Sequence, residues 1–153
     1  MPKIDIAAAR RREGTRYPAP FDTPCLSRVR QQLGDVAGLS QFGVNLLTLP
    51  PGTWSSQRHW QGKEDEFVWV LEGEVVLVED EGETVLRPGD CAGWKAGVPN
   101  GHCLQNRADR PAKVLEVGSR IEDEFVVYAD IDMQVGPDDV YRKKDGTPYP
   151  QGG

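Results

Sequence analysis

The stretch from Pro50 to Gly73 reads PPGTWSSQRHWQGKEDEFVWVLEG, and it decides how the chain folds. Alternate residues of a β-strand face the same side, so we expect His59 and Gln61 to point into one cavity. The short polar loop that follows reverses the chain, and Glu66 begins the returning strand. Three polar side chains from one hairpin can therefore converge on one point.

The second histidine of the chain lies in another segment punctuated by glycine and proline. His102 follows the loop 96–101, whose sequence is AGVPNG. The chain has 2 histidines in all. If the two segments meet in space, His59 and His102 belong to one site.

The spacing of turn residues predicts an all-β fold. The 17 glycines and 12 prolines fall between short runs that are rich in β-branched and aromatic residues. No stretch shows a sustained apolar period of 3.6 residues. A sandwich or jelly-roll barrel is the natural closure for such a pattern. The expected strands are 41–49, 55–61, 66–71, 75–79, 83–86, 91–94, 102–106, 112–117 and 125–128, and residues 27–33 fit either a strand or a helical turn.

The two ends of the chain differ from this middle part. Residues 1–39 are interpreted as an extended N-terminal arm and a lead-in strand, 40–128 as the barrel and 129–153 as an irregular C-terminal tail. The basic run 10–12 in the arm is expected to be solvated. Aromatic residues are rare in disordered tails, so Tyr141 and Tyr149 are expected to dock on the domain.

Composition excludes several classes of partner. The chain has 153 residues, enough for one domain with a real core. Its net charge of −6 argues against nucleic acid or an anionic membrane as the main partner. No apolar run approaches the ~20 residues that span a bilayer, and the N-terminus lacks the apolar core of a signal peptide. The expected location is the cytoplasm.

The cysteines do not predict a disulfide framework. There are 3 of them, an odd number, and no pair has the C-x-x-C spacing. Cys25 and Cys91 are expected to pack as small hydrophobes. Cys103 is adjacent to His102 and should point away from it on a strand. No thiol has a plausible base beside it, so nucleophilic catalysis is not supported.

The two segments that carry His59 and His102 resemble the two motifs of the cupin superfamily. In the first, G-x5-H-x-H-x(3,4)-E-x6-G, the matching positions are Gly52, His59, Glu66 and Gly73, with one extra residue after Gly52. In the second, G-x5-P-x-G-x2-H-x3-N, they are Gly89, Gly97, His102 and Asn106, with Lys95 in place of proline and two extra residues before His102. The resemblance covers about residues 40–118 and implies a cupin β-barrel, a double-stranded β-helix.

The resemblance also implies a divalent metal. Metal-binding cupins hold iron, manganese, nickel, copper or zinc with three histidines and one glutamate. The corresponding set here is His59, Gln61, Glu66 and His102, so one imidazole is replaced by an amide. Two histidines and a carboxylate still suffice for a metal with open positions. The alternative is a degenerate site, in which His59 and His102 hydrogen-bond Glu66 and Gln61 without an ion.

Other residues near the site have less specific predictions. Gln57 is expected to face the same cavity as His59, and Asn100 either reaches over the cavity mouth or shapes its loop. Asn106 is expected to satisfy a turn. Arg58 and Trp60 should face the opposite side of their strand, as packing or interface residues. Trp69 and Trp94 are expected in the core.

The implied function is that of a small-molecule-binding protein. Small single-domain bacterial cupins of the cupin 2 type that look similar are often described as sugar-phosphate isomerases. We therefore expect a metal-dependent isomerase or dioxygenase on a sugar-like or carbonyl substrate, with His59, Glu66 and His102 as catalytic residues. An isomerase also needs a base, and no second pocket carboxylate is identifiable. The alternative is a non-catalytic module that binds or senses a small ligand. A homodimer is expected from the resemblance, the apolar outer surface of one sheet and the arm.

Overall fold

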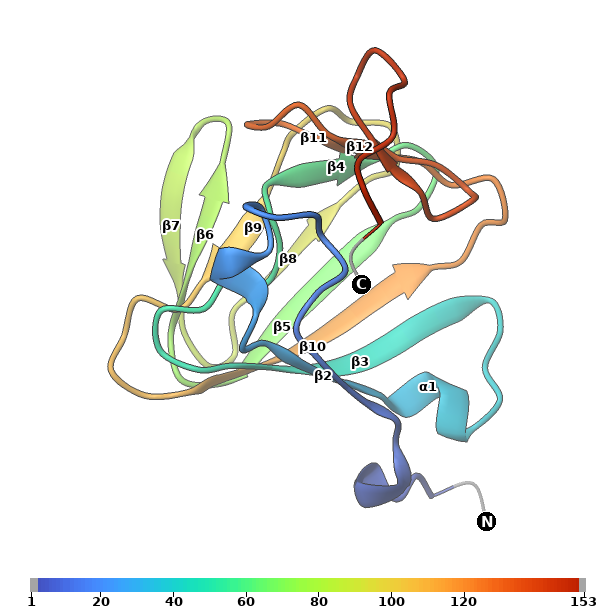
Figure 1. The fold of residues 1–153 in the computed structure, drawn as a ribbon. Helices are drawn as coiled ribbons and strands as arrows, with labels where there is room; N and C mark the ends of the chain where they lie inside the picture. Colours follow the sequence, from blue (N-terminus) through green and yellow to red (C-terminus); the bar gives the residue numbers. More distant parts are fainter. Residues whose placement is uncertain (1–2, 152–153) are drawn as a thin grey trace.

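The computed structural model describes residues 3–151 and consists mainly of short strands (Figure 1). One helical turn, α1 (Leu33–Val36), and two 3-10 turns, η1 (Ile6–Ala8) and η2 (Thr23–Cys25), interrupt the strands. The strands are β1 (Arg11–Glu13), β2 (Val29–Gln32), β3 (Phe42–Leu49), β4 (His59–Gln61), β5 (Glu66–Glu72), β6 (Val75–Glu79), β7 (Gly82–Leu86), β8 (Cys91–Trp94), β9 (Cys103–Gln105), β10 (Ala112–Ser119), β11 (Val126–Tyr128), β12 (Gln134–Val135) and β13 (Tyr141–Arg142).

The strands form three antiparallel sheets. The largest is 6-stranded, in the order β1-β2-β3-β10-β5-β8. A 3-stranded sheet, β7-β6-β9, and a 4-stranded sheet, β13-β12-β11-β4, cover its inner face. In Figure 1 the long strands β3, β10 and β5 lie below the two smaller sheets. The predicted all-β barrel of the jelly-roll type is confirmed.

Two glycines show why the turns need glycine. Gly73 joins β5 to β6 with a φ of 74°, and a Cβ there would come within 2.6 Å of the carbonyl oxygen of Pro111. Gly89 has a φ of 96° in the turn 87–90, where the Asp90 amide donates to the Arg87 carbonyl at 2.9 Å. Side chains other than hydrogen disfavour both conformations. Gly89 therefore has the positive φ that the third position of a type II turn requires.

The main core lies between the 6-stranded and the 3-stranded sheets. On β5, Val68 and Val70 point inward while Trp69 points outward and is 47% exposed. The expectation that Trp69 lies in the core is wrong, because the alternation of β5 places it on the outer face. The buried residues of this core are Leu47, Leu49, Val68, Val70, Val75, Leu77, Leu86, Leu104, Ala112 and Val114.

A second core joins the two ends of the chain. Tyr17 and Cys25 from the N-terminal segment pack with Tyr128 and Met133. Tyr141 and Tyr149 pack against this cluster, so their expected docking is confirmed. The arm and the tail therefore close one side of the barrel.

Local structure departs from expectation in three places. The strand expected at 55–61 is limited to β4, because residues 55–58 form bends. Residues 27–33 form strand β2 and then begin the helical turn α1, so both alternatives occur in sequence. Cys91 is exposed on β8 rather than packed as a small hydrophobe. None of the helices within residues 3–151 is long and apolar enough to cross a membrane.

Candidate functional site

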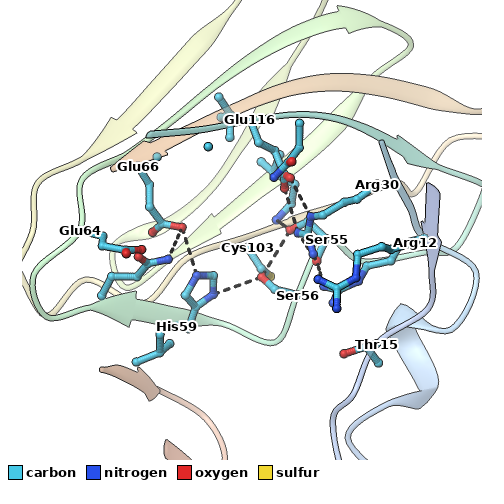
Figure 2. Close-up of a pocket in the computed structure, with 18 of the residues that line it drawn as sticks. Arg12, Thr15, Arg30, Ser55, Ser56, His59, Glu64, Glu66, Cys103 and Glu116 are labelled. Atoms are coloured by element: carbon cyan, nitrogen blue, oxygen red, sulfur yellow. Dashed lines mark hydrogen bonds and ion pairs between the residues drawn. The ribbon is translucent and has the colours of Figure 1, made fainter. Parts of the chain in front are cut away.

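A polar cavity of about 510 Å³ opens between the inner face of the large sheet and strands β4 and β11. This volume is in the range of small-molecule pockets. Figure 2 shows His59, Glu64 and Glu66 at one end of it and Arg12 and Arg30 at the other.

Glu66 is the centre of the first end. Its Oε1 lies 3.3 Å from Nε2 of His59, and its Oε2 lies 2.6 Å from Nε2 of His102. One ligand atom from each of these three residues lies within 4.8 Å of the others. The two stretches that carry the histidines meet directly, since His59 and His102 pair as a backbone bridge.

Backbone carbonyls orient both imidazoles. Nδ1 of His59 lies 3.0 Å from the carbonyl oxygen of Gln57, and Nδ1 of His102 lies 2.9 Å from that of Asn100. A carbonyl oxygen only accepts, so each Nδ1 carries a proton. Each neutral ring then presents the lone pair of Nε2 to the carboxylate. Such a contact is favourable only if Nε2 carries a second proton or if both atoms ligate one cation.

The charges at this end are strongly coupled. Burial raises the pKa of Glu66, but hydrogen bonds with His102 and His59 outweigh it and hold that pKa at about 2. Burial lowers the pKa of His59, but its hydrogen bond and proximity to Glu66 outweigh burial, so that the net shift is upward. The cluster therefore favours a carboxylate beside positive charge.

Gln61 joins the cluster as a hydrogen-bond donor. Its Nε2 donates to Oε1 of Glu66 at 3.1 Å. Its Oε1 is buried and has no hydrogen-bond partner among residues 3–151. An amide binds metals through its oxygen, so Gln61 must turn over its amide group to become a ligand.

The residues present fit a divalent metal through His59, Glu66 and His102. Their donor atoms are two imidazole nitrogens and a carboxylate oxygen, a set that iron and zinc accept. The second nitrogen of each imidazole donates to a carbonyl, as is usual for histidines that ligate metals. Gln61 is the one residue of the predicted ligand set whose donor oxygen does not face the other ligands.

Trp94 supports His102 by stacking on its imidazole ring. The two rings stack with centroids 3.8 Å apart and an interplanar angle of 3°. Nε1 of Trp94 donates to Glu79, which also accepts from the side chain of Asn100. The same Asn100 supplies the carbonyl that orients His102. Trp94 is partly buried and packs against the main core, as expected, and it also lies beside the site.

Three carboxylates that sequence reasoning missed line the cavity, namely Glu13, Glu64 and Glu116. Oε1 of Glu64 accepts from the Ile121 amide at 2.7 Å, and burial raises the pKa of Glu64. Both oxygens of Glu116 accept from Arg30. The position of Glu64, two residues before Glu66, was the available signal. The statement that the pocket has no second carboxylate is wrong.

Gln57 and Asn100 do not line this cavity. The side chain of Gln57 donates to the Phe21 carbonyl at 2.8 Å, because β4 begins only at His59 and its alternation does not extend back. The pocket prediction for Gln57 is therefore corrected. The side chain of Asn100 bonds Glu79 and the Asp80 amide, which corresponds to the loop-shaping alternative.

The remaining predictions concern packing. Asn106 satisfies its turn through bonds with Leu49, Arg110 and Ala108. Arg58 pairs with Asp80 and Asp130, away from the cluster. Trp60 packs edge-on against Phe125. Cys103 is buried, and burial raises its pKa to about 12.

Comparisons with known proteins agree with this fold. The profile of the cupin domain matches residues 45–118. The solved structure of a sugar phosphate isomerase from a cupin superfamily, from Silicibacter pomeroyi, is 46% identical, with a TM-score of 0.92, over 97% of this chain and 96% of that one. A structure from Acidithiobacillus ferrooxidans, provisionally described as a sugar phosphate isomerase, is 28% identical, with a TM-score of 0.68, over 80% and 74% of the chains.

More distant matches share the fold alone. The polyketide cyclase RemF from Streptomyces resistomycificus is 19% identical, with a TM-score of 0.61, over 78% of this chain and 79% of that one. No curated protein matches the chain significantly.

Proposed function

Because the chain belongs to the cupin superfamily, we propose that it is a metal-dependent isomerase of a small sugar-like carbonyl compound. The observation that carries the proposal is the convergence of His59, Glu66 and His102 on one point of a polar cavity. The name of the Silicibacter relative supports a sugar phosphate as the class of substrate.

The proposed ion is held by His59, Glu66 and His102, and Fe, Mn, Ni and Zn are the candidates. A bound cation of this kind polarises a carbonyl or hydroxyl oxygen and stabilises negative charge on it. The protein itself supplies the orientation of both imidazoles through their Nδ1 contacts.

Glu64 is the proposed base. Isomerisation moves a proton between the two carbons of a hydroxy carbonyl unit, and a carboxylate can remove and return it. Glu66 is held by both histidines and is unsuited to this step. Glu64 lines the same cavity and is joined to the ligand cluster by the short loop between β4 and β5. This favours the isomerase over the dioxygenase, which needs no such base.

A second candidate function is non-catalytic binding of a small ligand. The observation in its favour is that His59, His102 and Gln61 all contact Glu66 directly. Such a network can exist in a degenerate site without an ion. The cavity then binds or senses a polar molecule.

We also propose that the protein is a homodimer in the cytoplasm. Support for the dimer comes from Phe67, Trp69 and Leu71, large side chains exposed along the outer face of β5. Burying such a face against a second copy removes apolar area from water.

Metal analysis combined with turnover tests the function. Purified protein is incubated with Mn, Fe, Ni or Zn, freed of excess ion and assayed with a sugar phosphate by NMR. One bound ion per chain, lost in His59→Ala and His102→Ala, with interconversion of the aldose and ketose forms, is the expected result. No metal and no turnover, with retained sugar phosphate binding, would favour the binding module.

A further inference from the structure

The end of the cavity opposite Glu66 carries three arginines on one face of the sheet. Arg12 on β1 stands directly across from Arg30 on β2, and Arg28 lies two residues before Arg30. All three line the cavity, and Arg12 and Arg30 are labelled in Figure 2. We call Arg12, Arg28 and Arg30 the arginine cluster. Like charges opposite one another across two strands destabilise a sheet unless an anion compensates them.

The protein compensates only part of this charge. Arg30 pairs with both oxygens of Glu116, at 2.7 and 2.9 Å, and is the one member of the cluster with a salt bridge within residues 3–151. Arg28 is 8% exposed and donates to the carbonyls of Gly14 and Ser55. Burial and then the nearby Arg30 lower the pKa of Arg28. A buried guanidinium without a carboxylate is costly unless a ligand supplies negative charge.

The space beside the arginine cluster is lined by unsatisfied amides. The Oε1 atom of Gln32 and the Oδ1 atom of Asn45 are buried without a hydrogen-bond partner among the described residues. Both residues line the cavity, and they stand opposite one another on β2 and β3. Glu116 on β10 is next in the same row. Buried polar atoms of this kind are normally paired, so these amides fit the hydroxyl groups of a ligand.

The two ends lie within reach of one small molecule. The Arg30 side chain crosses β3 to contact Glu116 on β10, and β10 is the neighbour of β5, which carries Glu66. Adjacent strands are about 4.8 Å apart. The Ser55 carbonyl accepts from Arg28 and Arg30, and the neighbouring Ser56 hydroxyl lies 3.2 Å from Nδ1 of His59.

We propose that the arginine cluster is a subsite for the anionic group, a phosphate or a carboxylate, of the ligand whose carbonyl end lies at Glu66. The sugar-like nature of the ligand rests on the proposed function, whereas the anion subsite rests on the arginine cluster. Arg12 and Arg28 contact the oxyanion, Gln32 and Asn45 accept from hydroxyls, and Arg30 is held in place by Glu116. Guanidinium groups suit this task because their donors match the oxygens of phosphate and carboxylate.

Calorimetric titration of the metal-free and the metal-loaded protein tests the subsite. The probes are ribose 5-phosphate, riburonate (the C5 carboxylate of ribose) and free ribose. Arg12→Ala is compared with Arg11→Ala, because Arg11 is an exposed neighbour on β1 that does not line the cavity. We expect ribose 5-phosphate or riburonate to bind more tightly than ribose. Arg12→Ala should weaken the anionic probe by about tenfold, the loss of one charge-assisted contact. Arg11→Ala should change it by less than about twofold.

The outcomes distinguish a phosphate from a carboxylate, and they distinguish failure of the anion subsite from failure of the proposed isomerase. Preference for ribose 5-phosphate assigns a phosphate, and preference for riburonate a carboxylate; both support the subsite. Equal binding of the three probes, or equal effects of Arg11→Ala and Arg12→Ala, would overturn it. Arg28→Gln, if it folds, should weaken the anionic probe without weakening ribose. Anion binding without turnover would count against the proposed isomerase and leave the subsite standing.

Discussion

Nε2 of His102 lies 2.6 Å from Oε2 of Glu66, although Nδ1 of the same ring already donates to the Asn100 carbonyl. Because His59 repeats this arrangement with the Gln57 carbonyl, two imidazoles turn their second nitrogen toward one carboxylate. Together with the carboxylate, these nitrogens form a group of donor atoms that could ligate one cation. The fourth place of the cluster, Gln61, presents an N–H instead, and the first prediction depends on it.

Gln61→His should raise the affinity for Mn, Fe, Ni or Zn by at least about tenfold. Even substitutions of residues that only orient the ligands lower metal affinity by about that factor. An imidazole there adds a nitrogen ligand, whereas the amide must first turn over. Competition with a metal-binding dye measures the affinity. Gln41→His is the matched control, because Gln41 is exposed and does not line the cavity. Equal affinities of the wild type and Gln61→His would show that position 61 does not reach the ion.

Ion binding should change the fluorescence of Trp94. Its ring stacks on His102 at 3.8 Å, so an ion on that imidazole lies close to the indole. We expect Mn²⁺ or Ni²⁺ to reduce tryptophan emission. Trp94→Phe should abolish most of the change, and Trp69→Phe, on the outer face, should retain it. A response that survives Trp94→Phe would place the ion elsewhere.

Glu64→Gln should lower kcat for the isomerisation by about 10²–10⁴-fold, the usual contribution of a general base. Metal content and binding of the sugar phosphate should stay near the wild-type values, because Glu64 is not among the proposed ligands. Exchange of substrate hydrogen with deuterated water, followed by NMR, reports the proton transfer itself. Glu122→Gln is the control at an exposed carboxylate of the neighbouring loop. Normal exchange in Glu64→Gln would exclude this residue as the base.

Leu47→Ala should lower the free energy of unfolding by about 2–5 kcal/mol, because it leaves a cavity in the core. Leu47 is 0% exposed between the sheets. Leu71→Ala makes the same chemical change at a side chain that is 44% exposed, and it should cost no more than about 0.5 kcal/mol in the monomer. Urea unfolding gives both values. Similar losses for the two variants would contradict the assignment of inner and outer faces.

Trp69→Lys should dissociate the proposed dimer. The chain has a mass of 16.9 kDa, and sedimentation velocity distinguishes this from twice the value. A lysine on the outer face of β5 places a charge where two apolar faces would meet. Val85→Lys is the control, since Val85 is 40% exposed on β7 of the smaller sheet. A wild-type monomer, or a dimer unaffected by Trp69→Lys, would count against this interface.

Much of the fold is predictable because β-sheet signals are local. Strands β6 and β8 have the expected bounds. The turns at Gly73 and Gly89 need glycine because both residues have a positive φ. The prediction fails where alternation is extended past the real end of a strand. Gln57 is an example, since the bends at 55–58 turn its side chain toward Phe21.

The candidate site is only partly predictable. His59, Glu66 and His102 are marked by two motifs, and the barrel brings them together as expected. Glu64 and the arginine cluster have no comparable mark. Arg12 is exposed, as expected, and it also lines the cavity because β1 pairs with β2 at the edge of the large sheet.

The sequence by itself determined the all-β class, the hairpin that presents His59 and Glu66, and the replacement of an imidazole by Gln61. These features depend on residue type and on spacing along the chain, because the local geometry of a strand fixes which side each side chain faces. Only the tertiary structure decided that Trp94 stacks on His102, that Glu64 joins the cavity, and that Arg12 and Arg28 face it from the other end. Those relationships join segments far apart in the chain, and they depend on strand register and on the packing of sheets, which no single stretch of sequence encodes.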